Sequence, residues 1–350
     1  MKQILALAAL GLAITGCVKI EDDGTSTPTE PARDLAAYLD GSLLDDGWSG
    51  GERLVSIDTS DGPHNVWIKR TGNNPEMKLL LLHGGPGGTS DYFGAFDSFL
   101  PGTAVEYYRY DQLGAGRSDK PDNDALWTIP RFVDEVDQVR EAIGGDGSNF
   151  CLLGHSWGGI LAIEYALAHP GEVKCLVISN MMASIPAYNR YADEVLKPQM
   201  APEKLARVEQ LEAEGKIDDP DYMGILMPEF YEKHILRRPA AEWPEPVNYG
   251  FAQMNQHVYV LMQGPSELGA SGLLEDWDRF EDLAKIGVPT LVISGKHDTM
   301  DPAHMAAMAK KLPQGELVAT EGSHMAMYDD QKAYFAGLNA FLLRQAKRGD

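Results

Sequence analysis

The chain has 350 residues, of which 44% are hydrophobic and 23% charged, so it can form one large globular core or a core with an insertion. Its formal net charge of −22 and sequence pI near 4.7 argue against nucleic acid as a partner, because phosphate binding needs clustered Lys and Arg. An acidic surface fits a secreted soluble protein and weakly favours cationic substrates.

The first 16 residues have the composition of a secretory signal. A short positive start precedes Ile4–Ile14, an apolar run too short to span a bilayer. The run ends in Ile14-Thr-Gly-Cys17, which resembles the lipobox of bacterial lipoproteins, whose cysteine is lipidated and becomes the first mature residue. The alternatives are a plain secretory signal or an uncleaved anchor. We predict a signal peptide over residues 1–16 and lipid attachment at Cys17, on the periplasmic face of the bacterial envelope and favouring the outer membrane.

Residues 17–50 are predicted to form a tether and lead-in, polar and rich in Pro and Thr between Glu21 and Pro31. From about Arg53, short apolar runs alternate with helical stretches. The predicted strands are Val66–Lys69, Lys78–Leu82, Ala104–Tyr110, Phe150–Leu153, Cys175–Ser179, Thr290–Ser294 and Gly315–Thr320. The predicted helices are Ile129–Ile143, Ile160–Ala168, Pro302–Lys311 and Asp330–Gln345. This alternation predicts a doubly wound, mostly parallel α/β core over residues 51–180 and 287–350.

The alternation breaks over residues 181–286, which are rich in Met, Tyr, Trp and Pro and contain helical runs such as Pro202–Glu214 and Glu229–Arg238. An insertion directly after the strand Cys175–Ser179 is expected to cover the carboxyl ends of the strands, where the sites of such sheets lie. We therefore predict a helical cap that limits access to the site and excludes water.

Two cysteines remain beyond Cys17. Cys151 and Cys175 both lie in apolar runs with strand character. An oxidising compartment would permit a disulfide between them, but two buried free thiols are the simpler interpretation of the sequence.

Gly154–Gly158 has the pattern Gly-x-Ser-x-Gly between a buried strand and a helical run. A serine hydroxyl is a weak nucleophile unless a base contacts it, so it must stand clear of the backbone. A strained strand-to-helix turn achieves this, and glycines avoid collisions with the neighbouring strand and helix. We predict Ser156 as a nucleophile.

A serine nucleophile needs a base and an orienting acid, which follow it in the order Ser, acid, His in α/β-hydrolases. Asp298 lies in the turn after the strand Thr290–Ser294, and His324 follows the strand Gly315–Thr320. We assign these two residues to the triad. The other candidates are Asp301, which looks like a helix N-cap, and His155, His169, His297 and His304.

The oxyanion hole is expected to use the backbone N–H of Trp157, directly after the nucleophile, and one N–H from an earlier loop. The loop His83–Gly88 is rich in glycine and follows an apolar strand, and Gly85 is the predicted second donor. Phosphate binding is the alternative for such a loop, but the Gly-Lys-Ser/Thr ending of a P-loop is absent. No cofactor or metal is expected.

Four motifs in this order resemble the proline iminopeptidase family of α/β-hydrolases, which includes tricorn-interacting aminopeptidases. They are His83-Gly-Gly-Pro-Gly87, Asp111-Gln-Leu-Gly-Ala-Gly-Arg-Ser118, Gly154-His-Ser-Trp-Gly-Gly159 and Gly295-Lys-His-Asp298. The resemblance runs from about Leu54 to Leu343. It implies an α/β-hydrolase fold with an inserted helical cap, and release of an N-terminal residue, often proline, from short peptides.

Members of this family use cap carboxylates to hold the free α-amine of the substrate, since a buried ammonium needs a paired negative charge. Gly264-Pro-Ser-Glu267 and Pro228-Glu-Phe-Tyr231 are similar to the two glutamate-bearing segments, which implies substrate-binding roles for Glu267 and Glu229. The chain departs from the family at His155, where Gly is frequent, and at His297, where Tyr is frequent. These departures weaken an expectation of strict proline specificity.

Three hypotheses follow from the sequence. The first is a serine aminopeptidase acting on a short peptide or amino-acid-derived substrate with a free N-terminus. The second keeps the same triad for an amino-acid amidase, an esterase or a lactonase. The third is a surface lipoprotein without catalysis, which the presence of the nucleophile, the histidine and the glycine-rich loop argues against. Epoxide-hydrolase or dehalogenase chemistry would need a carboxylate in place of Ser156.

Overall fold

A computed structural model of the protein describes residues 38, 40–41, 46–74 and 76–347. The predicted signal peptide, Cys17 and most of the tether lie outside these residues. The described residues belong to one compact unit that spans Arg33–Asp350. No helix in this described part is both long and apolar enough to cross a membrane.

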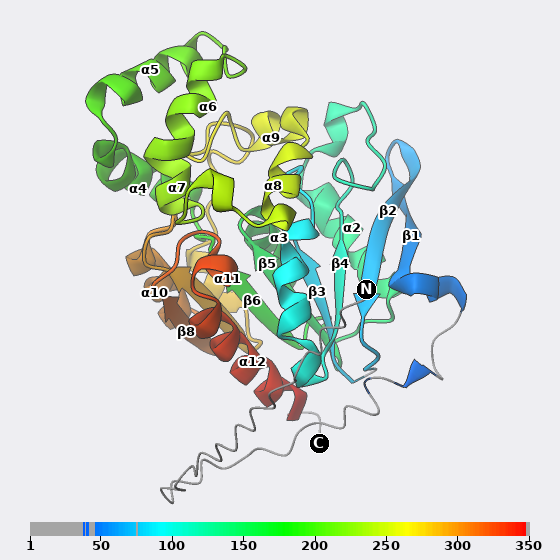
Figure 1. Cartoon of the computed structure of the whole chain (residues 1–350). Coiled ribbons are helices and arrows are strands. Elements are labelled where there is room, and N and C mark those ends of the chain that lie inside the picture. The colour runs from blue at the N-terminus through cyan, green and yellow to red at the C-terminus, as the bar shows by residue number, and fades with distance from the viewer. Residues whose placement is uncertain (1–37, 39, 42–45, 75, 348–350) are drawn as a thin grey trace, which may run out of the picture. The chain divides into compact units, whose positions relative to one another are not determined.

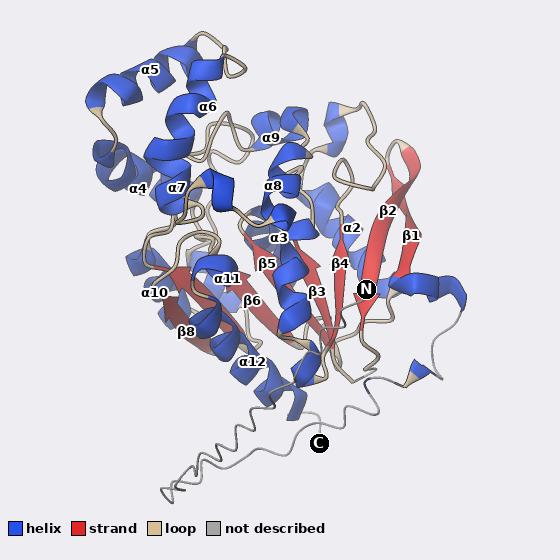
Figure 2. Ribbon diagram, viewed as in Figure 1, coloured by secondary structure: helices blue, strands red, loops and turns tan. Residues whose placement is uncertain are grey.

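An eight-stranded sheet with the order β1-β2-β4-β3-β5-β6-β7-β8 forms the centre of the fold (Figures 1 and 2). The strands are β1 (Glu52–Thr59), β2 (Gly62–Thr71), β3 (Lys78–Leu82), β4 (Glu106–Tyr110), β5 (Phe150–His155), β6 (Cys175–Ser179), β7 (Thr290–Gly295) and β8 (Gly315–Thr320). The first two strands pair antiparallel, and β2 also pairs antiparallel with β4. All pairs from β4 to β8 are parallel. The predicted doubly wound α/β class is therefore confirmed.

Helices cover both faces of this sheet. The core helices are α2 (Ile129–Ala142), α3 (Trp157–Ala168), α10 (Pro302–Lys311), α11 (Ala326–Asp329) and α12 (Gln331–Lys347). Because successive strand residues face opposite ways, Leu80 and Leu82 pack in one core with α2, α3 and α10. Leu79 and Leu81 face a second core, which contains the apolar side of α12. Strands buried on both faces explain why these segments are nearly continuous apolar runs.

Strand β1 was not predicted, because its side chains give almost no apolar signal. Only Val55 and Ile57 are buried in it, and Leu54 points outward with 58% of its surface exposed. The strand is held by pairing with β2 at the sheet edge rather than by burial. Such a half-solvated edge strand is hard to recognise from hydrophobicity alone.

Six short helices lie between β6 and β7 and gather above the sheet in Figure 1. They are α4 (Ile185–Tyr191), α5 (Pro202–Ala213), α6 (Pro220–Leu226), α7 (Glu232–His234), α8 (Glu245–Ala252) and α9 (Gln256–Met262). The helix expected over Glu229–Arg238 is wrong in detail. A π-helical turn occupies Met227–Tyr231 and α7 ends at His234. Pro228 has no N–H to donate, which favours a local departure from regular α-helix at this point.

The interpretation of Cys151 and Cys175 as free thiols is wrong. The two residues are direct partners in the parallel pair of β5 and β6, with a Cα–Cα distance of 4.7 Å, and they form a disulfide. Both are fully buried. The register of the two strands, which the sequence pattern does not reveal, places the sulfurs together.

Removing this disulfide is expected to destabilise the protein without changing its active site. The bridge closes a loop with a sequence separation of 24, which corresponds to about 3–4 kcal/mol of loop-closure stabilisation. A Cys151→Ala/Cys175→Ala variant should therefore unfold at lower urea concentration than the wild type. A reductant should lower the wild-type midpoint and leave the variant unchanged. Equal wild-type midpoints with and without reductant would contradict the bridge.

Candidate active site

Ser156 lies at the sharp turn between β5 and α3. Its backbone has φ 55° and ψ −129°, a strained conformation for a residue with a side chain. Both neighbouring glycines are sterically required, because a Cβ on Gly154 would lie 1.9 Å from the Gly158 carbonyl oxygen. A Cβ on Gly158 would lie 2.0 Å from the Leu82 carbonyl oxygen. The geometry therefore raises the hydroxyl at the carboxyl edge of the sheet, as the Gly-x-Ser-x-Gly pattern predicts.

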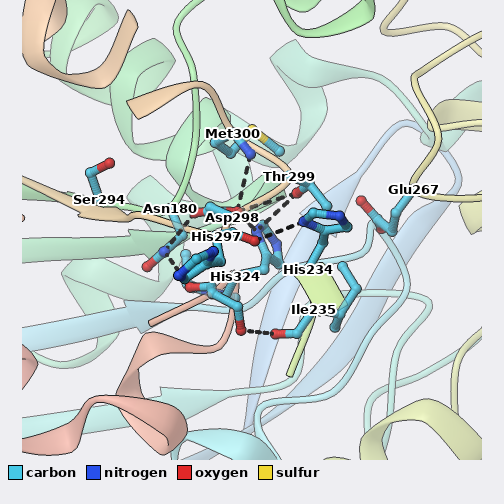
Figure 3. A network of polar contacts seen from close by, with 12 residues as sticks. Asn180, His234, Ile235, Glu267, Ser294, His297, Asp298, Thr299, Met300 and His324 are labelled. Carbon is cyan, nitrogen blue, oxygen red and sulfur yellow. Dashed lines mark hydrogen bonds and ion pairs between the residues drawn. The ribbon is translucent and has the colours of Figure 1, made fainter. Parts of the chain in front are cut away.

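Asp298 and His324 form a buried pair at the same edge of the sheet. His324 Nδ1 donates to Asp298 Oδ1 over 2.8 Å, and both side chains are almost completely buried (Figure 3). Burial alone would raise the pKa of Asp298, but the charge and hydrogen bond of His324 and the amide of Asn180 hold this pKa below its ordinary value. The carboxylate is therefore ionised, and it fixes the tautomer that leaves His324 Nε2 free to accept a proton.

Asn180, which sequence reasoning missed, holds the second oxygen of the acid. Its amide nitrogen donates to Asp298 Oδ2 over 2.7 Å and to the Ser323 carbonyl over 3.1 Å. The residue follows β6 directly and has φ 54°, a left-handed conformation that Asn tolerates better than most residues. It thus bridges the loops that carry Asp298 and His324. Its position directly after a strand that ends at this sheet edge was the available signal.

Asp301 is not part of this pair. Its carboxylate accepts a hydrogen bond from the Ala303 N–H over 2.8 Å and caps α10, as its position before Pro302 predicted. Among the other histidines considered, His304 lies on α10 and His169 follows α3. Neither of these lines the cavity described below.

The predicted oxyanion donors are the backbone N–H groups of Gly85 and Trp157, and Gly85 lines the same cavity as Ser156. Trp157 is the first residue of α3, and the first N–H groups of a helix have no intrahelical acceptor. Gly84, in contrast, already donates its N–H to the Tyr92 hydroxyl over 2.7 Å. Among the backbone hydrogen bonds of the described residues, none has the Gly85 N–H as its donor. A Cβ on Gly84 would lie 3.0 Å from Ser156 Cβ, so the loop passes directly beside Ser156.

A cavity of about 350 Å³ joins these groups under the cap. Ser156, His324, Gly84 and Gly85 form its floor, and the cap supplies most of the remaining wall. The cap contributes mainly apolar side chains, which include Ile217, Tyr222, Met223, Met227, Tyr231, Ile235, Val247, Phe251, Met254 and Tyr259. Such a lining suits a small apolar substrate group and keeps bulk water away from the reacting atoms.

Glu267 is the one carboxylate among the described residues that line this cavity. Its Oε1 accepts a hydrogen bond from the Tyr259 hydroxyl over 2.7 Å. The Tyr188 hydroxyl fixes the backbone by donating to the Glu267 carbonyl over 2.6 Å. Burial raises the pKa of Glu267, against the opposing effects of His324 and Tyr259. A carboxyl group is therefore held close to Ser156 and His324, in a place where a positive charge would stabilise its ionised form.

Glu229 is not brought to the same cavity. Its carboxylate contacts Lys204 over 2.6 Å and Lys233 over 3.2 Å on the outside of the cap. The lysine contacts lower the pKa of Glu229, so this group is an ionised surface carboxylate. The sequence predicts a helix at Glu229 but does not predict which side of the helix its side chain is on. The π-helical turn determines that side. Glu229 is therefore absent from the site that we propose below.

The cap makes main-chain contacts with the loop that carries His324. The His324 N–H donates to the His234 carbonyl over 2.9 Å, and the Met325 N–H donates to the Ile235 carbonyl over 2.8 Å. His234 Nδ1 also donates to the carbonyl of His297, over 3.0 Å, directly before Asp298. The cap is thus connected to the loops that carry Asp298 and His324.

Comparison with known proteins agrees with this geometry. Residues 79–337 match the profile described as "Alpha/beta hydrolase family". A proline iminopeptidase of Flavobacterium johnsoniae is 49% identical over 290 residues, covering 83% of this chain and 97% of the relative. A proline iminopeptidase of Elizabethkingia meningoseptica is 48% identical over 292 residues, with coverage of 83% and 97%.

A solved structure extends the similarity to three dimensions. The crystal structure of proline iminopeptidase from Mycobacterium smegmatis has a TM-score of 0.74 and 30% identity, covering 85% of this chain and 100% of that chain. Together with the sheet order and the elbow at Ser156, these similarities identify the fold as that of an α/β-hydrolase. The chain belongs to the proline iminopeptidase family of α/β-hydrolases and is a hydrolytic enzyme.

Proposed function

We propose that the protein is a serine aminopeptidase that releases an N-terminal residue, proline or another small apolar residue, from short peptides. The observation that carries this proposal is the carboxyl group of Glu267, which lines the same apolar cavity as Ser156 and His324. A carboxylate there would pair with the α-amine of a substrate whose first carbonyl lies at the nucleophile. The names of the relatives support the same substrate class.

The chemistry follows from the positions of these groups. Ser156 Oγ attacks the carbonyl carbon of the first residue while His324 Nε2 takes the hydroxyl proton. The Gly85 and Trp157 N–H groups donate to the oxyanion that develops. His324 then returns the proton to the leaving amine, which departs and leaves an acyl-enzyme. A water molecule, deprotonated by the same His324, hydrolyses the ester and releases the free amino acid.

The Ser156 hydroxyl and His324 line the same cavity but are not hydrogen-bonded to each other in the described structure. Catalytic hydrogen bonds often tighten only when substrate is bound. A substrate that fills the cavity and pairs its amine with Glu267 would bring its carbonyl to the nucleophile and favour this contact. The interaction of the substrate amine with Glu267 would thus help to orient the substrate carbonyl at Ser156.

A substrate panel tests the proposal. Pro-x dipeptides and prolyl amides should be hydrolysed, and peptides with other small apolar first residues more slowly or equally. N-acetylation of the same peptides should remove most of the turnover, because a neutral amide cannot pair with Glu267. Equal turnover of free and acetylated peptides would contradict amine recognition, although a simple ester would still be cleaved by the triad.

On the acid side of the pH profile, activity should be lost at a higher pH than an ordinary histidine would give. Burial by itself lowers the pKa of His324, but the charge and hydrogen bond of Asp298 and the charge of Glu267 outweigh it and raise this pKa above its ordinary 6.5. His324 must be neutral to accept a proton, so activity is lost as pH falls through the raised pKa. The profile of kcat/KM on a simple ester should therefore reach half its maximum above pH 6.5. A midpoint below this value would contradict the assignment.

We also propose that the protein is a lipid-anchored component of the bacterial envelope. The signal-like start and Cys17 motivate this location, and the buried disulfide is compatible with an oxidising compartment. In cells fed a radiolabelled fatty acid, the wild type should carry label and fractionate with membranes, and Cys17→Ser should do neither. Label that persists in the variant would place the lipid elsewhere.

A further inference from the structure

His155 is a buried titratable residue that the proposed reaction does not use. The side chain lines the catalytic cavity, and its ring centroid lies 4.9 Å from that of His324. His155 Nε2 lies 2.9 Å from the main-chain carbonyl oxygen of His324. The residue is therefore in contact with the backbone of the proposed base.

The direction of every hydrogen bond in this neighbourhood follows from the acceptor at one end. A carbonyl oxygen can only accept, so the proton of His155 lies on Nε2 and donates to His324. Burial lowers the pKa of His155 to about 3, so the ring is neutral and its Nδ1 is an acceptor. The Tyr92 hydroxyl, 3.0 Å from Nδ1, must then be the donor to it.

The Tyr92 oxygen completes the chain by accepting the Gly84 N–H over 2.7 Å. Three hydrogen bonds in one direction thus connect Gly84 to the carbonyl of His324 through Tyr92 and His155. Gly84 precedes the proposed oxyanion donor Gly85, and a Cβ on it would lie 3.0 Å from Ser156 Cβ. This series of hydrogen bonds begins at the proposed oxyanion loop and ends at the backbone carbonyl of His324, the proposed base.

Resting on the proposed acyl-transfer site, we propose that Tyr92 and His155 are positioning residues that couple the oxyanion loop to His324. The coupling fixes the spacing between the N–H of Gly85 and the imidazole across Ser156. A displacement of about 1 Å in such a site can cost about 100-fold in rate, so a buried connection between the two sides has a direct catalytic value. The neutral ring suits this role, because a bare Nδ1 is needed to accept from Tyr92.

Three substitutions each interrupt this series of hydrogen bonds at a different place. The amide nitrogen of His155→Gln can reach the position of Nε2 and donate to His324, but the acceptor for Tyr92 is lost. The shorter amide of His155→Asn can contact Tyr92 from the position of Nδ1 and cannot reach the carbonyl of His324. Tyr92→Phe removes the hydroxyl and leaves the Gly84 N–H without its acceptor.

The readouts should separate the two ends. We expect His155→Gln and Tyr92→Phe each to lower kcat on a simple ester by roughly 10-fold to 100-fold with little change in KM. Both should weaken binding of a free-amine boronic acid, which forms a tetrahedral adduct with Ser156, and should leave the acid limb of the pH profile in place. His155→Asn should instead change the pH at which activity falls on the acid side of the profile, because the contact with the His324 backbone is lost.

A double variant tests the coupling itself. If the two residues act as one chain, Tyr92→Phe/His155→Gln should be no slower than the worse single variant, whereas independent effects would multiply. Tyr107→Phe is the matched control, because this buried tyrosine donates to Asp97 over 2.6 Å, away from the cavity. It should change the thermal midpoint alone.

Two results would overturn the proposal. One is a set of chain variants that lose thermal stability as the control does while kcat and boronate affinity stay at wild-type values. The other is multiplicative loss in the double variant. Because the ester assay and the boronate adduct require the triad but no peptide, failure of the aminopeptidase assignment would be seen separately, as a wild type that cleaves the ester and no peptide.

Discussion

Ser156→Ala is expected to lower kcat on both a prolyl peptide and a simple ester by about 10⁶-fold, to the rate that binding and oxyanion stabilisation alone provide. The side chain lies at a strained turn and forms no hydrogen bond among the described residues that stabilises the fold. The variant should therefore retain the wild-type unfolding midpoint and still bind a free-amine dipeptide. Loss of labelling by a serine-directed fluorophosphonate would locate the nucleophile.

Ser184→Ala is a suitable control for this experiment. Ser184 is also a buried serine, but its hydroxyl caps α4 and donates to Asp278 over 2.8 Å, away from the cavity. The control should lose about 1 kcal/mol of stability and keep its kcat and its labelling. Retention of more than about a thousandth of wild-type kcat in Ser156→Ala would contradict nucleophilic catalysis by this residue.

Glu267→Gln should separate amine recognition from acyl transfer. The amide keeps the oxygen that accepts from Tyr259 and removes the charge that would pair with a substrate ammonium. Loss of one partner of a buried charge pair costs about 2–5 kcal/mol, so kcat/KM for a free-amine prolyl peptide should fall by roughly 30-fold to several thousand-fold. Turnover of a simple ester and of any residual N-acetylated substrate should be nearly unchanged.

The same substitution should change the pH profile on the ester. The charge of Glu267 contributes to the raised pKa of His324, so its removal should move the acid limb to lower pH. Glu229→Gln provides the matched control, because that carboxylate pairs with Lys204 and Lys233 outside the cavity. The control should leave both substrates and the limb unaffected. An equal loss on ester and peptide in Glu267→Gln would favour the amidase, esterase or lactonase hypothesis.

The elements that could be predicted are those whose signal lies within one short segment. Buried parallel strands such as Lys78–Leu82 are continuous apolar runs, and the turn at Ser156 requires glycines at fixed spacing. Asp298 and His324 could be singled out because both lie in the loops after predicted strands, and parallel strands end at a common edge. Each of these predictions needed no knowledge of which strands are neighbours.

The features that were missed depend on contacts between segments. The disulfide requires the register of β5 against β6, and the role of Asn180 requires that the loops of Asp298 and Ser323 meet at its amide. The position of Glu229 depended on the local widening of a helix, and the contact of His155 with His324 joins residues far apart in the chain. Local patterns predict residue types at the site, and tertiary structure decides their partners.

The N–H groups of His324 and Met325 donate to the carbonyls of His234 and Ile235, which has a consequence for how the enzyme opens. A cap that lifted as a rigid lid would break these hydrogen bonds and release His324, the proposed general base, from its orientation. We therefore expect the molecule with a wide-open cap to be inactive as a hydrolase. A polypeptide that is large enough to need the open cap would then enter without being cleaved. Only a substrate small enough to enter while the cap is closed would then be cleaved. Folded proteins around the enzyme would not be hydrolysed.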